Sequence, residues 1–130
     1  MRSQKFLSIF IIAFTLLNIN SSYSIEADTF VQSTVNRASQ ALDNKFSKEE
    51  KINQLKNIAN ETVDIKGIGF YTLGSYRKDI TEEQKKKYLI LFKQYFLKSF
   101  SSRLAEYSNP EIEVLSKKVL NEKYTMVFSK

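Results

Sequence analysis

Apolar side chains occupy an unusually wide sector of the segment from Thr81 to about Tyr107, which is predicted to form one long helix. Thr81 and Gln84 have the spacing of a capping box, which satisfies unpaired N–H groups at a helix start. At 100° per residue the apolar positions span roughly 260°, whereas a helix buried on one side needs roughly 100°. Other elements must therefore enclose this helix, and the simplest interpretation is a central core helix. One sector holds Tyr88, Leu91, Phe92, Tyr95 and Phe96, and the adjoining sector holds Leu89, Ile90, Leu97, Phe100 and Leu104.

Two shorter helices with one buried face each are predicted before the long helix. The first runs from Asp28, as its N-cap, to Leu42. The second begins at Ser47, which has the capping-box spacing to Glu50, and ends near Thr62. Their apolar residues are mostly slim, which suits close contact with the aliphatic sector of the long helix. These residues are Val35, Ala38 and Leu42 in the first helix and Ile52, Leu55, Ile58 and Ala59 in the second.

All three glycines of the chain lie between Asp64 and Gly74, the segment that precedes the long helix. Gly67 and Gly69 each cost roughly 1 kcal/mol relative to alanine inside a helix, so a short helix or irregular turns are expected here. Asp64 is expected to cap this short helix. Gly74 suits a helix C-terminus with positive φ.

The hydrophobic pattern changes from a period of 3.6 to a period of two after the predicted turn at residues 108–110. Ile112 and Val114 alternate with polar residues in one run, and Tyr124, Met126 and Phe128 alternate in a second run. Helices followed by two antiparallel strands predict an α+β fold, in which the aromatic sector of the long helix packs on the small sheet. A sheet of two strands is marginal in water and has open edges, so further strands, or a partner that supplies them, are expected.

The first 24 residues have the layout of a secretory signal peptide. Two cations precede an apolar run from Phe6 to Leu17, and small residues stand at −3 and −1 of a cleavage site after Ser24. This run is shorter than the roughly 20 residues that a membrane-spanning helix needs, so a signal is favoured over a permanent anchor. Cleavage after Ser24 would release a single domain of residues 25–130 that does not span the membrane, and cleavage after Ala27 is the alternative.

The residue inventory offers little for catalysis. The 130 residues include no Cys and no His, which removes the thiolate nucleophile, the imidazole base and the usual zinc ligands. Asp64 is the one carboxylate that stands out beside the glycines, and helix capping accounts for it. Neither an enzyme activity nor a metal or cofactor is expected.

A formal charge of +6 and the basic runs at residues 85–87 and 117–118 raise the question of nucleic-acid binding. Residues 85–87 point to different sides of their helix, Glu82 and Glu83 lie beside them, and the signal directs the chain away from nucleic acid. Nucleic-acid binding is therefore not expected. The lysines are expected instead to keep the protein soluble or to attract anionic lipid head groups.

Several motifs resemble the signature region of the MlaC family, which is also called the toluene-tolerance family. The most specific is the segment Leu73-Gly74-Ser75-Tyr76-Arg77, and spaced aromatic residues follow it. The resemblance covers about residues 28 to 128. Because the family pattern continues for several more strands, the resemblance implies a single lipid-binding domain that is incomplete at its C-terminus. The other matching positions are Val63-Asp64, Thr81 to Gln84, Tyr88, Phe92, Tyr95-Phe96 and Leu104-Ala105-Glu106-Tyr107.

This resemblance implies a periplasmic phospholipid carrier of Gram-negative bacteria. It would shuttle lipid between an outer-membrane lipoprotein complex and an inner-membrane MCE-type ABC transporter complex, and so maintain the lipid asymmetry of the outer membrane. Acyl tails would lie between the long helix and the sheet, with the head group near solvent. The expected apolar wall consists of Phe70, Leu73, Tyr76, Tyr88, Leu91, Phe92, Tyr95, Phe96, Val114, Met126 and Phe128. The alternative is a shortened relative that carries no lipid and acts as a secreted interaction module.

Overall fold

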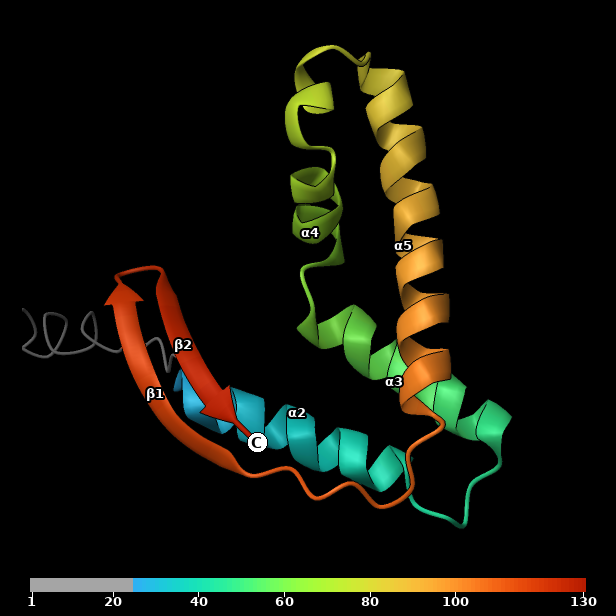
Figure 1. Ribbon diagram of the computed structural model, residues 1–130, viewed down its shortest axis with the longest axis vertical. Helices are drawn as coiled ribbons and strands as arrows, with labels where there is room; N and C mark the ends of the chain where they lie inside the picture. Colours follow the sequence, from blue (N-terminus) through green and yellow to red (C-terminus); the bar gives the residue numbers. More distant parts are fainter. Residues whose placement is uncertain (1–24) are drawn as a thin grey trace, which may run out of the picture.

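The computed structural model describes residues 25–130. The predicted signal peptide, residues 1–24, lies outside the described residues. Helices followed by an antiparallel hairpin confirm the predicted α+β class (Figure 1). The elements are α2 (Ala27–Ala41), α3 (Lys48–Thr62), α4 (Ile65–Thr72), the 3-10 helix η2 (Gly74–Lys78), α5 (Glu82–Leu104), β1 (Val114–Asn121) and β2 (Tyr124–Ser129).

The first two helices begin with different kinds of cap. In α3 the N–H of Glu50 donates to the Ser47 hydroxyl and the N–H of Ser47 donates to the Glu50 carboxylate, which confirms the predicted capping box. In α2 the prediction that Asp28 is the N-cap is wrong, because Glu26 holds that position and no side chain caps the helix. Asp28 lies instead in the first turn and pairs with Lys117 of β1 at 3.1 Å, a contact that the local pattern could not reveal.

The glycine segment forms the short helix α4 and the turn that follows it. The Gly67 N–H donates to Asp64 Oδ1 at 2.9 Å, so Asp64 caps α4 as predicted. Gly74 has a φ of 55°, in the left-handed region that a helix C-terminus requires, and this prediction is also confirmed. The η2 turn then reverses the chain, so that α4 and α5 lie side by side.

The long helix α5 begins at the predicted capping box. The Thr81 N–H donates to the side chain of Gln84 at 2.9 Å, and the Gln84 N–H donates to Thr81 Oγ1 at 3.2 Å. The helix ends at Leu104 rather than at Tyr107, and the N–H of Tyr107 closes a final turn on the carbonyl of Leu104. Asn109, within the predicted turn, has a positive φ of 48°.

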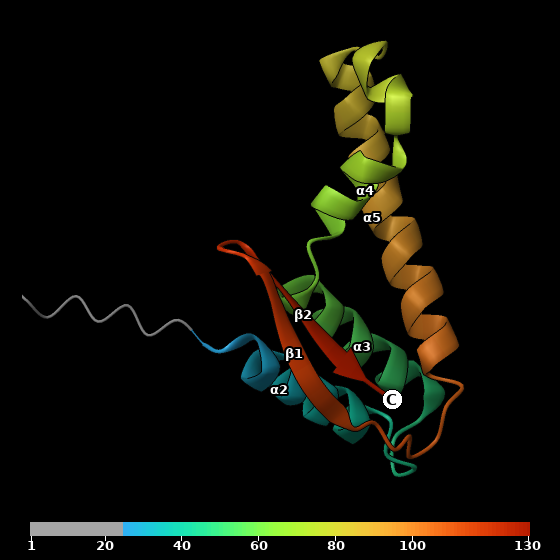
Figure 2. The same cartoon turned by 60° about the vertical axis from the view of Figure 1, so that its left-hand side comes forward.

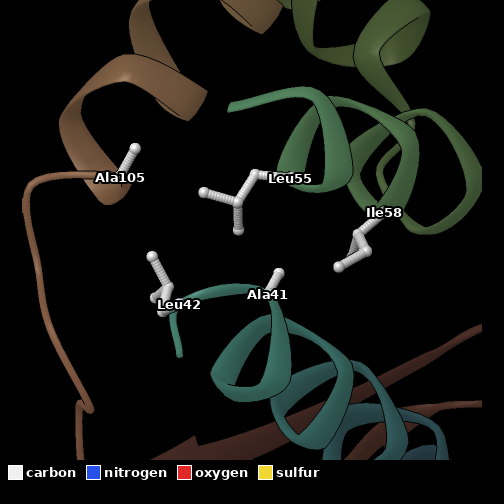
Figure 3. Close-up of a cluster of buried hydrophobic side chains, with 5 residues drawn as sticks. All are labelled: Ala41, Leu42, Leu55, Ile58 and Ala105. Carbon is white, nitrogen blue, oxygen red and sulfur yellow. The ribbon is translucent and has the colours of Figure 1, made fainter. Parts of the chain in front are cut away.

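A small core lies where α2, α3 and the C-terminal end of α5 meet (Figure 3). Leu55 is its largest fully buried apolar side chain and is 1% exposed. Leu104 packs against this core as predicted, but Leu89 of the same predicted sector lies beside Gly69 of α4, so only the C-terminal end of that sector contacts the first two helices. Burial of one such leucine contributes about 1.5 to 3 kcal/mol. The core residues are Ala41, Leu42, Leu55, Ile58 and Ala105, with Ala38, Ile52 and Leu104 around them.

The β1–β2 hairpin packs on α2 and not on α5 (Figures 1 and 2). The ammonium group of Lys117 on β1 pairs with Glu26 and Asp28 at the start of α2. The prediction that the sheet packs on the aromatic sector of the long helix is therefore wrong. Helical periodicity gives the width of an apolar sector but does not identify the element that covers it, and the hairpin finds its charged partners on α2.

We call residues 65–104, which form α4, η2 and α5, the helical arm. From the end where α5 meets α3, the arm projects away from α2 and the hairpin (Figures 1 and 2). Within it, Leu91 is 54% exposed and Tyr95 is 70% exposed. The described residues therefore leave much of the wide apolar sector of α5 uncovered.

Candidate functional site

Four aromatic rings form a stacked ladder along α5. Its members are four residues apart, so each ring stands above the next on the helix surface. The ring centroids of Tyr88 and Phe92 are 6.0 Å apart, those of Phe92 and Phe96 6.1 Å, and those of Phe96 and Phe100 5.4 Å. We call these four residues the aromatic ladder. Three of them belong to the predicted wall; Phe100 does not, although its spacing of four from Phe96 was the signal that could have identified it.

The N-terminal half of the aromatic ladder is covered by α4. A Cβ atom at Gly69 would lie 2.7 Å from Cδ1 of Phe92, so the absence of a side chain there lets the two helices approach closely. The Thr72 hydroxyl donates to the carbonyl of Gly69 at 2.8 Å, so the Tyr88 hydroxyl is the donor in its 2.9 Å contact with Thr72. Tyr88 and Phe92 therefore hold the arm together. The predicted wall residue Leu73 is buried just after α4.

The C-terminal half of the aromatic ladder borders an open groove of about 660 Å³, which we call the α5 groove. Two small residues, Ser99 and Ser102, leave space beside the rings of Phe96 and Phe100. Lys98 and Arg103 add two cations. The groove can therefore hold an apolar chain close to positive charge. Its lining is Tyr95, Phe96, Lys98, Ser99, Phe100, Ser102 and Arg103.

Four other predicted wall residues are exposed on the arm. Leu91 and Tyr95 lie on α5, Phe70 lies on α4 and Tyr76 lies on η2. Tyr76 is 72% exposed and Phe70 is 38% exposed. Together with the α5 groove, these side chains make the arm an apolar surface that the described residues do not cover.

The three predicted wall residues on the strands lie on a different surface. Lys117 pairs with α2, and its cross-strand neighbour is Val127, so the face of the hairpin that carries these two residues is turned toward α2. Met126 and Phe128 flank Val127 and point to the opposite face, because side chains alternate along a strand. Val114 is half-buried at the start of β1. The structure thus places the helical wall residues on the arm and the strand residues on the hairpin, and it joins only Tyr88, Phe92 and Phe96 of the predicted wall by ring stacking.

Charge pairing fixes the hairpin to α2. The pKa of Asp28 lies below its usual value, chiefly because Lys117 donates a hydrogen bond to its carboxylate. The pKa of Lys117 is raised, first by its hydrogen bond to Glu26 and then by that to Asp28. Both shifts favour the charged forms, so the ion pair persists at neutral pH.

The side chains gathered at the aromatic ladder and the α5 groove are aromatic, hydroxyl and cationic. They can hold an amphipathic molecule by burying its apolar part and by attracting a negative charge. Among residues 25–130, no three acidic side chains cluster as metal ligands. In the same range, no helix is both long enough and apolar enough to cross a membrane.

The amino-acid sequence matches the model of one known protein family. The family model described as MlaC protein matches residues 29–130, a range that includes the helical arm, the α5 groove and the hairpin. No curated protein and no solved structure matches the chain. The matched range covers most of the chain. This protein therefore belongs to the MlaC family, a family of periplasmic phospholipid-binding transport proteins.

Proposed function

We propose that this protein carries phospholipid across the periplasm between an outer-membrane lipoprotein complex and an inner-membrane MCE-type ABC transporter complex. In this way it helps to maintain the lipid asymmetry of the outer membrane. The observation that carries the proposal is the aromatic ladder of α5, with the α5 groove open beside its C-terminal half. Membership of the MlaC family supports phospholipid as the cargo.

The apolar surface of α5 suits the burial that a phospholipid needs when it is carried through water. A two-chain phospholipid exposes on the order of 30 methylenes, and each contributes about 0.8 kcal/mol when it is buried. A carrier must therefore present a long apolar surface that its own side chains leave open. On α5 the exposed side chain of Leu91 adds apolar surface to that of Tyr95, which lines the groove. Binding is passive, with the acyl tails along α5 and the head group toward solvent.

Mass spectrometry of the lipid extracted from the purified, processed protein tests carriage directly. We expect phospholipid in the wild-type extract. Phe96→Asp places a charge in the α5 groove and should sharply reduce the retained lipid, because a carboxylate is costly beside an acyl chain. Tyr107→Ser is the control, since Tyr107 is 60% exposed and does not line the groove. Circular dichroism would establish that both variants are folded.

Two results would count against the proposal in different ways. Wild-type protein that contains no phospholipid would contradict carriage. Equal lipid content in wild type and in a folded Phe96→Asp variant would contradict the placement of the tails along the α5 groove.

The second candidate function is a secreted interaction module that carries no lipid. The hairpin favours it, because the sheet has two strands within residues 25–130 and therefore has open edges. Open edges can accept a strand from a partner. The outer face of the hairpin also carries exposed apolar side chains, at Tyr124, Met126 and Phe128. Lipid-free protein from its native periplasm, in an extract where a control lipid carrier retains its cargo, would favour this candidate over carriage.

A further inference from the structure

We propose that a groove between α4 and the start of α5 binds a phosphate group, either in a phospholipid head group or as free phosphate. We call it the cationic groove. Its volume is about 390 Å³, and it lies on the part of the arm that is far from the hairpin (Figure 1). In its lipid form the inference rests on the proposed function; in its free-phosphate form it does not. The lining residues are Lys66, Phe70, Glu82, Lys85, Lys86 and Leu89.

Cationic side chains from two other elements lie near the ring of Phe70. Lys85 Nζ of α5 lies 5.7 Å from the centroid of the ring, and Arg77 Cζ of η2 lies 5.9 Å from it. Both distances are within the range of a cation–π attraction. Lys66 and Phe70 are one turn apart on α4. Three elements of the arm therefore place cations around Phe70, of which Lys66 and Lys85 line the cationic groove and Arg77 does not.

Most of this charge has no partner within the described part of the chain. Glu82 is the one acidic residue in the lining, and its carboxylate pairs with Lys85 at 2.5 Å. Lys66, Arg77 and Lys86 form no ion pair within residues 25–130. The cationic groove thus keeps an excess of positive charge beside the exposed ring of Phe70.

A partly desolvated lysine strengthens the attraction for an anion. The side chain of Lys85 is 18% exposed, whereas that of its partner Glu82 is 87% exposed. Charges interact more strongly where water is partly excluded. An anion in the groove would therefore interact more strongly with Lys85 than with a fully solvated lysine, and Lys66 and Lys86 supply the positive charge that Glu82 does not neutralise.

Phosphate fits this arrangement better than a ligand without charge. The ammonium groups of the lining lysines can form charge-assisted hydrogen bonds to phosphate oxygens. The apolar side chains of Phe70 and Leu89 can contact the carbon atoms to which a phosphodiester is joined. Leu89 follows Tyr88, where the aromatic ladder begins. A phospholipid could therefore place its phosphate in the cationic groove while its tails run along α5.

The test uses the full processed protein and three probes. These are a short-chain phosphatidylglycerol below its micelle concentration, a diacylglycerol with the same acyl chains, and inorganic phosphate. The variant is Lys66→Gln with Lys86→Gln, which removes two exposed, unpaired charges from the groove. The control is Lys56→Gln with Lys123→Gln, which removes the same charge from α3 and the hairpin turn, outside both grooves. Affinities are measured by fluorescence titration for the lipids and by NMR shifts for phosphate.

We expect the wild type and the control to bind phosphatidylglycerol more tightly than diacylglycerol. The groove variant should lose at least about tenfold in affinity for phosphatidylglycerol, because the loss of even one charge-assisted hydrogen bond is worth about a tenfold change, and it should keep its affinity for diacylglycerol. This result supports a lipid head group as the ligand. Saturable binding of inorganic phosphate that the groove variant loses, without any preference between the lipids, supports free phosphate.

The inference is overturned if the wild type binds both lipids equally and binds no phosphate, and lipid carriage then still stands. It is also overturned if the groove variant and the control behave alike with all three probes. If neither lipid binds but phosphate binds and is lost in the groove variant, the cationic groove is supported and carriage is contradicted. The two proposals can thus fail separately.

Discussion

Replacing Gly69 by alanine tests how closely α4 packs against the aromatic ladder. The added Cβ would lie 2.7 Å from Cδ1 of Phe92 and 3.1 Å from Cδ2 of Leu89, both closer than the roughly 3.5 to 4.0 Å optimum between carbon atoms. The ring of Phe92 has little freedom to move, because it stacks between Tyr88 at 6.0 Å and Phe96 at 6.1 Å. Either α4 must shift away from α5 or the ladder must deform.

Two opposing contributions set the size of the effect. Overpacking of a well-packed interface costs about 1 to 3 kcal/mol, whereas alanine in place of glycine inside a helix gains about 1 kcal/mol. We therefore expect Gly69→Ala to lower the free energy of unfolding by up to about 2 kcal/mol. For a domain of this size, each 1 kcal/mol corresponds to about 4 to 8 °C in Tm.

Urea unfolding followed by circular dichroism measures this change, and a double-mutant cycle with Phe92→Ala isolates its cause. Without the Phe92 ring the main clash disappears, so Gly69→Ala should then raise stability by about 1 kcal/mol through helix propensity. The reasoning is refuted if Gly69→Ala raises stability by the same amount in both backgrounds, because α4 and α5 would then not be in close contact at this point.

Three further predictions concern the rest of the chain. Leu55→Ala should lower the free energy of unfolding by about 2 to 5 kcal/mol, while the exposed Leu91→Ala should change it by at most about 0.5 kcal/mol; similar urea midpoints for the two would contradict the assignment of the core. The folded-state pKa of Asp28 is depressed by Lys117, so its stabilising effect is present above the unfolded pKa of about 3.9 and is lost as pH falls through the folded value. Asp28→Asn should therefore lower Tm at pH 7, and Tm of the variant should fall less steeply than that of the wild type below about pH 4. If Tm falls equally steeply in both proteins below this pH, the result argues against this pairing. Ser47→Ala removes the cap of α3 and should cost about 0.5 to 2 kcal/mol in urea unfolding, whereas no loss would mean that the capping box contributes nothing.

Local features of this fold could be predicted because their partners are close in the sequence. The capping boxes of α3 and α5 join residues three apart, and the left-handed Gly74 ends a helix whose last turn directly precedes it. The same holds for β2, whereas β1 runs from Val114 to Asn121 and so lies mostly beyond the predicted alternation of Ile112 and Val114. The helix positions at which Phe96 and Phe100 stack also follow from a spacing of four. These features depend on backbone geometry over a few residues, which the amino-acid pattern largely determines.

The surroundings of each element were decided by contacts between distant residues. The sequence indicates that α5 has a wide apolar sector, but tertiary structure places the hairpin on α2, where Lys117 meets Glu26 and Asp28. The cationic groove likewise depends on Phe70 and Lys85, which belong to different helices and meet because Gly69 lets α4 approach α5. The chain by itself thus determined the class, the helices and the apolar character of this MlaC-family protein. Only tertiary packing decided which faces are covered and which stay open, because periodicity defines the direction in which a side chain points and not the partner that it meets.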